Sequence, residues 1–146
     1  MCPLPLVVPK KEEFVLLNRT TKSAAELVPI STGNLGLACR IAAELGAHIV
    51  KTYYCDDFEQ LIESCPIPVI IAGGKKTPEM EALELAHNAV THGAVGVDMG
   101  RNIFQSDSPV GMIKAVRSIV HEHVSVKEAC KIYESSKGEK KRRAAG

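Results

Sequence analysis

One lysine interrupts an apolar, strand-forming stretch in the first half of the sequence. Lys51 lies two positions from both Ile49 and Tyr53, and strand alternation places all three side chains on one face. Burial in these surroundings, with a cation such as Lys75 or Arg101 nearby, would favour the uncharged form of the amine. Because only a neutral amine attacks a carbonyl, the pattern predicts Schiff-base chemistry at Lys51.

Two glycine-containing turns follow the lysine, each at the end of a predicted strand. The first contains Gly73 and Gly74, and the second contains Gly100 and Arg101. Glycine lets a ligand approach the backbone, where N–H groups can face an anion, and a guanidinium matches the oxygens of a phosphate. Ligands of parallel α/β folds bind beyond the carboxyl ends of the strands. We therefore expect a phosphate site beside Lys51.

Each of these features also has a purely structural interpretation. A lysine in a strand can lie at a sheet edge with its ammonium in water, and a Gly-Gly pair can be an ordinary turn before a helix. Tyr53 and Asp98 could transfer a proton or orient the amine, but Tyr53 could instead pack on a helix and Asp98 could face away. Cys55 has no histidine paired with it in sequence, and His48 falls on the face opposite Lys51, so we interpret both as bystanders.

Alternating helices and strands would position these residues. We expect strands at 48–54, 68–72 and 94–97. We expect helices over the segments 33–46, 56–66, 77–93, from 109 to about 120 and from 125 to about 133. The helix that ends at Gly46 carries Leu37, Ile41 and Leu45 as its predicted core-facing stripe. Thr77 is the expected N-cap of the third helix, and Ser125 with Glu128 forms a capping box for the last.

Strands separated by helices must run parallel with right-handed crossovers, so the fold class is α/β. Three strand–helix units leave two open sheet edges. Either residues 1–32 add strands, or the chain is part of something larger, or it assembles with copies of itself. We divide the chain into a poorly defined segment 1–32, the strand–helix units at 33–135 and a basic, disordered tail at 136–146.

Composition narrows the range of partners. The 146 residues fit one domain, with 45% hydrophobic and 24% charged residues and a net charge of +1. Only 4% of the residues are aromatic, which argues against nucleic-acid binding by base stacking. No apolar run approaches the ~18 residues of a membrane span. Five scattered cysteines without a C-x-x-C pair or a zinc-like cluster predict reduced thiols, a cytoplasmic location and no metal site.

Four segments in order resemble one enzyme family, the archaeal-type class I aldolases (the DhnA group). The matching segments are Arg40–Ala47, Ile49–Tyr54, Pro68–Lys76 and Gly96–Asp107. The resemblance covers roughly residues 35 to 135 and is strongest to the members of the group that act as thiolases in autoinducer-2 processing. Two departures stand out: Ala72 occupies the position of a serine in the aldolases of the group, and residues 1–32 do not match the family's earlier strands.

The resemblance implies a fold and a set of site residues. The chain would hold the last three units of a (β/α)8 TIM barrel, with Lys51 as the Schiff-base lysine. The phosphate would bind at Gly73, Gly74, Gly100 and Arg101.

The resemblance also implies a reaction. A phosphorylated hydroxypentanedione would be cleaved and its acetyl group passed to coenzyme A as co-substrate, leaving glycerone phosphate, with no bound cofactor. A fructose-bisphosphate-type aldolase acting through the same lysine is the alternative. A second alternative is a non-catalytic phosphate-binding half-domain that needs a partner chain.

Overall fold

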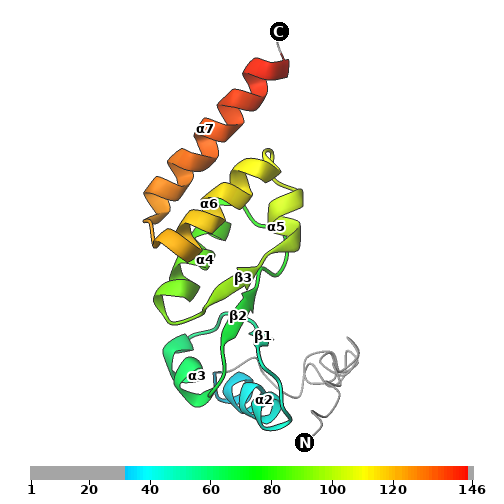
Figure 1. The fold of residues 1–146 in the computed structure, drawn as a ribbon, viewed down its shortest axis with the longest axis vertical. Coiled ribbons are helices and arrows are strands. Elements are labelled where there is room, and N and C mark those ends of the chain that lie inside the picture. The colour runs from blue at the N-terminus through cyan, green and yellow to red at the C-terminus, as the bar shows by residue number, and fades with distance from the viewer. Residues whose placement is uncertain (1–31, 145–146) are drawn as a thin grey trace, which may run out of the picture.

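The computed structural model describes residues 32–144, which form an open α/β arrangement (Figure 1). The helices and strands in chain order are α2 (Thr32–Glu44), β1 (Val50–Thr52), α3 (Phe58–Ser64), β2 (Val69–Ala72), α4 (Glu79–Thr91), β3 (Gly96–Asp98), α5 (Gly100–Phe104), α6 (Pro109–Glu122) and α7 (Val126–Ala144). The predicted order of helices and strands is confirmed. The segment expected to be poorly defined, residues 1–32, lies outside the described residues except for Thr32.

The three strands form a parallel sheet in the order β1-β2-β3. Lys51 pairs with Ile70, and Ala72 pairs with Asp98, so the carboxyl ends of all three strands meet at one edge. Within the described residues, the outer edges of β1 and β3 are unpaired. The expected α/β class and unclosed sheet are confirmed.

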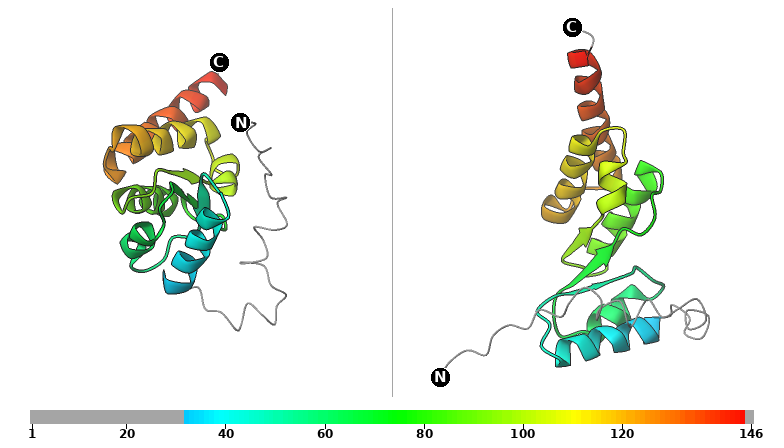
Figure 2. Two further views of the ribbon diagram at one scale, coloured as in Figure 1. Left: turned by 60° about the horizontal axis from the view of Figure 1, so that its bottom comes forward. Right: turned by 90° about the vertical axis from the view of Figure 1, so that its right-hand side faces the viewer.

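One face of the sheet is covered by helices, as Figure 2 shows. Val50, Val69 and Ile71 are buried on this face. They join a core built mainly from α3, α4 and α6, whose largest buried side chains include Leu61, Leu83, Met112 and Ile119. The apolar run of β2 predicts a strand covered on both faces, but Ile70 and Ala72 on the second face are only half-buried.

Helix α2 forms where it was predicted, but the predicted apolar face is not the face that is buried. Leu37, Ile41 and Leu45 are 60%, 37% and 83% exposed, whereas Cys39 is 2% exposed. Among the described residues α2 packs on α3 and β1, so only the narrow face around Cys39 is covered. The four-residue spacing identifies an apolar stripe correctly, yet which stripe is buried depends on neighbours that periodicity does not specify.

The C-terminal helix begins as predicted and ends later. The Ser125 N–H donates to Glu128 Oε2 (3.0 Å), and the Glu128 N–H donates to Ser125 Oγ (3.3 Å), so the capping box is confirmed. The tail expected to be disordered from residue 136 instead continues α7 to Ala144 (Figure 1), and Lys137 pairs with Asp107 at 2.6 Å. Strong helix formers in this segment and the ion pair explain the difference. No helix within residues 32–144 is long and apolar enough to cross a membrane.

Candidate active site

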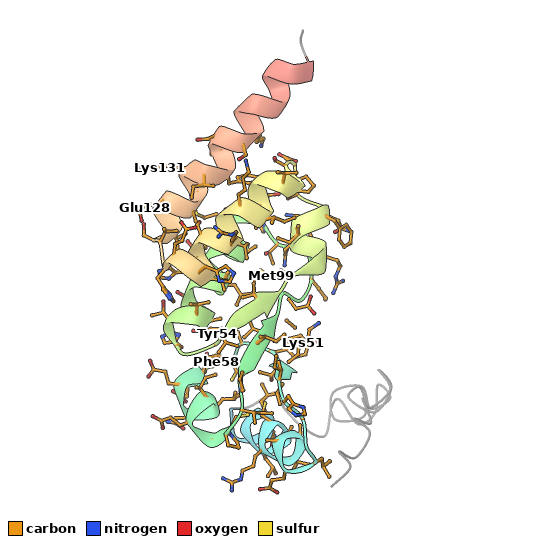
Figure 3. All side chains as sticks on the ribbon, in the orientation of Figure 1. Lys51, Tyr54, Phe58, Met99, Glu128 and Lys131 are labelled. Atoms are coloured by element: carbon orange, nitrogen blue, oxygen red, sulfur yellow. The ribbon has the colours of Figure 1, made fainter. Side chains whose placement is uncertain are left out.

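Lys51 lies on the sheet face that the helices leave uncovered. Exposed Ile49, Lys51 and Tyr53 alternate with buried Val50 and Thr52, as the strand pattern predicts. Figure 3 shows the lysine extending from β1 away from α3. Its side chain is 49% exposed.

The Lys51 ammonium is paired with a carboxylate. Its Nζ donates to Asp98 Oδ2 at 2.5 Å, and the Asp98 side chain is 54% exposed. The expected burial of the amine beside a cation is therefore wrong: the Lys51 side chain is half-exposed, and β3 places a carboxylate next to it. Of the two orientations open for Asp98, the structure has the one that faces Lys51, where the carboxylate can orient the amine and accept its proton.

Asp98 also connects the lysine to the first glycine turn. The Gly73 N–H donates to the Asp98 carbonyl oxygen at 3.0 Å, which continues the β2–β3 pairing past the end of β2. Gly100 follows Asp98 by two residues and begins α5. Lys51 and both glycine turns therefore lie together at the carboxyl end of the sheet, as expected from the sequence.

The three glycines differ in whether the surrounding structure requires a glycine. A Cβ at Gly73 would lie 2.7 Å from Met99 Cγ and 2.9 Å from Met99 Cα, so Gly73 permits close contact between two loops. Gly74 has a φ of +65°, which is a left-handed conformation that favours glycine. No atom lies within 4 Å of the position that a Cβ would take, so its backbone is also accessible. A Cβ at Gly100 would make only an ordinary 3.8 Å contact with Phe104.

Arg101 projects from α5 with an exposed side chain. Among the ion pairs of the described part of the chain, none involves Arg101. The second glycine turn leads directly into the short helix α5, Gly100–Phe104. Arg101 can therefore turn toward an anion at the glycine turns without breaking a protein ion pair.

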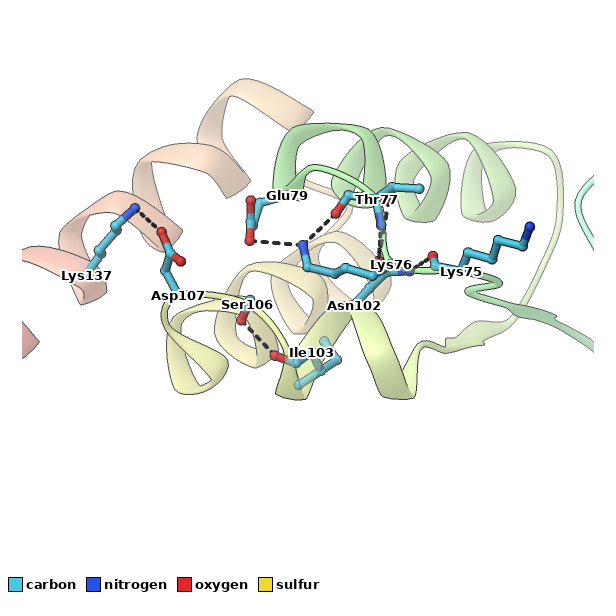
Figure 4. Close-up of polar contacts among 9 residues, drawn as sticks. All are labelled: Lys75, Lys76, Thr77, Glu79, Asn102, Ile103, Ser106, Asp107 and Lys137. Carbon is cyan, nitrogen blue, oxygen red and sulfur yellow. Dashed lines mark hydrogen bonds and ion pairs between the residues drawn. The ribbon is translucent and has the colours of Figure 1, made fainter.

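Asn102 is a site residue that the sequence reasoning missed. It is 1% exposed and lies between the two loops (Figure 4). Its Nδ2 donates to the carbonyl oxygens of Gly73 (2.7 Å) and Lys75 (3.2 Å). Its Oδ1 accepts from the Thr77 N–H (2.9 Å) and, at 3.5 Å, from Thr77 Oγ1. The only sequence signal was an amide residue directly after the second glycine turn.

The contacts of Asn102 explain why Thr77 is not the N-cap of α4. The helix begins at Glu79 after Pro78, with no side-chain cap hydrogen bond, so this prediction is wrong. The N–H and the hydroxyl group of Thr77 are both directed to Asn102 instead. Lys76 turns toward the helix, where its Nζ donates to Glu79 Oε1 at 3.0 Å and lowers the pKa of that carboxyl group.

The two tyrosines after β1 lie in different environments. Tyr53 is 37% exposed on the same face as Lys51. Tyr54 packs against Phe58, with ring centroids 5.0 Å apart, and its hydroxyl pairs with His92 Nδ1 at 2.9 Å. Burial raises the pKa of Tyr54. Tyr54 is thus part of the packing, and Tyr53 remains the tyrosine that could reach a ligand bound at Lys51.

Within the described residues, no group of three or more histidine, cysteine, aspartate or glutamate side chains is arranged to hold a metal ion.

A comparison with family models finds one match over most of the described site. Residues 15–106 match the DeoC/LacD family aldolase model. This range holds Lys51 and both glycine turns, and it begins inside the segment 1–32 that we could not match from the sequence.

Curated relatives match at higher identity over a shorter range. The chain is 57% identical over 103 residues to the 3-hydroxy-5-phosphonooxypentane-2,4-dione thiolase of Salmonella paratyphi A, covering 70% of this chain and 35% of the relative. An uncharacterized aldolase of Pasteurella multocida is 57% identical over 98 residues, which are 66% of this chain and 34% of that relative. The chain thus spans about a third of the length of these curated relatives.

Solved aldolase structures share the fold. An archaeal fructose 1,6-bisphosphate aldolase superposes with a TM-score of 0.60 at 30% identity, covering 63% of this chain and 38% of that one. A second archaeal fructose-1,6-bisphosphate aldolase structure has its catalytic lysine covalently bound to the carbinolamine intermediate of the substrate. It superposes with a TM-score of 0.58 at 29% identity and covers 62% of this chain and 38% of that chain. The fructose-bisphosphate aldolase of Slackia heliotrinireducens superposes with a TM-score of 0.62 at 23% identity, covering 72% of this chain and 37% of that chain. These neighbours are TIM-barrel aldolases, so the three strands correspond to part of a barrel.

Proposed function

The chain belongs to the DeoC/LacD family of aldolases, and from this premise we propose that Lys51 is the Schiff-base nucleophile for a phosphorylated ketone. The observation that carries the proposal is the position of the lysine: its Nζ lies 2.5 Å from Asp98, whose backbone pairs with Gly73. An amine with an adjacent proton acceptor lies next to two turns suited to an anion.

The proposed steps use groups at this edge of the sheet. As the Lys51 amine attacks the ketone carbon, Asp98 accepts the ammonium proton, and loss of water gives an iminium ion. The carbon–carbon bond between the α and β carbons then breaks, and its electron pair moves toward the iminium and forms an enamine. In aldol cleavage the β-hydroxyl loses its proton and the other fragment leaves as an aldehyde; in the thiolase reaction the coenzyme A thiolate first adds to the β carbonyl, and the other fragment leaves as the acetyl thioester. Protonation and hydrolysis then release the shortened ketone. Asp98 or Tyr53 would supply the proton.

Gly73, Gly74, Gly100 and Arg101 would hold the phosphate. Support comes from the left-handed, accessible backbone of Gly74 and from the Arg101 guanidinium, which has no ion-pair partner among the described residues. Gly73 would contribute through the close contact of its loop with Met99 rather than by leaving space for the ligand.

For the substrate we propose a phosphorylated hydroxypentanedione, with coenzyme A accepting the acetyl group and glycerone phosphate released. The support is the 57% identity to relatives that carry the thiolase name. Aldol cleavage of a ketose bisphosphate without coenzyme A is the second candidate, supported by the 30% identity to an archaeal fructose 1,6-bisphosphate aldolase.

Borohydride trapping tests the nucleophile. The protein is incubated with glycerone phosphate, reduced and mapped by mass spectrometry, and we expect one adduct, on Lys51. The Lys51→Met variant should give no adduct, whereas Lys127→Met, which removes an exposed lysine of α7, should react normally. Absence of an adduct in the unaltered chain would favour a non-catalytic phosphate-binding role. Release of acetyl-coenzyme A would separate the thiolase from the aldolase.

A further inference from the structure

The side-chain amide of Asn102 has every hydrogen-bonding position occupied. Both N–H groups donate to loop carbonyls, those of Gly73 and Lys75, and the oxygen accepts two bonds from Thr77. Because the nitrogen faces two acceptors and the oxygen faces two donors, the amide fits in one orientation only. A carboxylate of the same shape would place an oxygen against two carbonyl oxygens.

These contacts hold a segment that lacks regular structure. Residues 73–77 lie between the end of β2 and the start of α4, so their polar groups need partners outside a helix or sheet. Three of the five residues bond to Asn102, which lies in α5 directly after the second glycine turn. Figure 4 shows Asn102 reaching from α5 to Lys75 and Thr77 of this segment.

We propose that Asn102 is the positioning residue that joins the two glycine loops into one phosphate-binding unit. It acts through the backbone of residues 73–77 and does not itself touch the ligand. Gly74 keeps its left-handed conformation because Asn102 fixes the residues on both sides of it, Gly73 and Lys75. This inference rests on the proposed phosphate site.

Discrimination between a phosphorylated and an unphosphorylated ketone tests this role. Borohydride trapping at Lys51 is measured with glycerone phosphate and with dihydroxyacetone. Asn102→Ala and the isosteric Asn102→Asp should lower the preference for the phosphorylated ketone on the order of tenfold. Their reaction with dihydroxyacetone should not change, a split that a general loss of stability would not produce. Asn88→Ala, an exposed asparagine of α4, is the matched control.

The possible results separate the two proposals. An unaltered chain that reacts equally with both ketones would remove the proposed phosphate site and this inference with it. A clear preference that persists in both Asn102 variants would overturn the inference alone.

The unaltered chain provides a second test if both variants fail to fold. By linkage, phosphate must strengthen the bonds that preorganise its own site. Saturating inorganic phosphate should therefore slow amide hydrogen exchange at Thr77, whose N–H donates to Asn102. Exchange at Ala129 of α7, whose N–H donates to the carbonyl oxygen of Ser125 just before that helix, should stay constant. Phosphate binding that leaves Thr77 exchange unchanged would overturn the inference.

Discussion

The β1 flank (residues 32–52) and the glycine-loop flank (residues 69–104) are built from the same strand–helix unit but differ in how completely they are packed. In the glycine-loop flank, Leu83 is 0% exposed and Asn102 is 1% exposed. In the β1 flank, Leu37 is 60% exposed, and the Lys51 side chain is half in solvent. The proposed anion site is therefore the better-supported half of the active site, and the proposed nucleophile lies on the open half.

The difference has a geometric cause. Both β1 and β3 have an unpaired outer edge within the described residues, but α4 packs on β3 and also on α6 and α7, whereas α2 packs mainly on β1 and α3. In the aldolases that share this fold, the chain continues well beyond the part matched here. Water exclusion around a Schiff-base lysine requires walls on both sides, and residues 32–144 supply one of them.

Core truncation should separate the two flanks most strongly. Leu83→Ala removes a fully buried side chain of α4 and should lower the free energy of unfolding by about 2–5 kcal/mol. Leu37→Ala removes an exposed leucine of α2 and should change it by less than about 0.5 kcal/mol. Urea denaturation of both variants measures the contrast. Equal losses would mean that the Leu37 face is covered in solution, and the comparison between flanks would fail.

The glycine positions should give the next largest contrast. Gly73→Ala forces a Cβ to within 2.9 Å of Met99 Cα, an overpacking that should cost about 1–3 kcal/mol. Gly33→Ala places a methyl group where no atom lies within 4 Å, in a helix that favours alanine, and should cost nothing. Thermal unfolding of the Gly73→Ala and Gly33→Ala variants measures this difference in stability. A neutral Gly73→Ala would show that Met99 moves easily and that the two loops are not held together by this contact.

Sequence reasoning recovered the features that depend on local pattern and missed those that depend on neighbours. The elements follow from periodicity, and the capping box of α7 follows from Ser125 and Glu128, three residues apart. The buried face of α2 does not follow from periodicity, because the burial of Leu37 and Cys39 depends on which elements pack beside them. Asn102 was missed for the same reason, since its four hydrogen bonds join residues far apart in sequence. For Lys51 the face was predicted, but Asp98 was only one of two possibilities for its neighbour, because the face on which Asp98 lies depends on the register of β3.

The buried thiol of Cys39 gives the β1 flank a pH dependence. Burial raises the pKa of Cys39 from 9.0 to about 11, so between these values the unfolded chain has lost a proton that the folded chain keeps. Stability then falls as pH rises through this window. By the middle of this pH window, the free energy of unfolding of the unaltered chain should have fallen by roughly 1 kcal/mol more than that of the Cys39→Ala variant. Denaturation curves of both chains at several alkaline pH values measure the difference, and parallel curves would contradict the buried position.

The pair formed by Lys51 and Asp98 should contribute least to stability. Both side chains are about half exposed, and ion pairs of this kind contribute at most about 1 kcal/mol because solvent screens them. A double-mutant cycle with Lys51→Met and Asp98→Asn should give a coupling below this value that falls further in concentrated salt. The same Asp98→Asn change should slow trapping of a ketone at Lys51, because the amine loses its proton acceptor. A large coupling that resists salt would place the pair in a closed, dry site, and the β1 flank would then be as well enclosed as the glycine-loop flank.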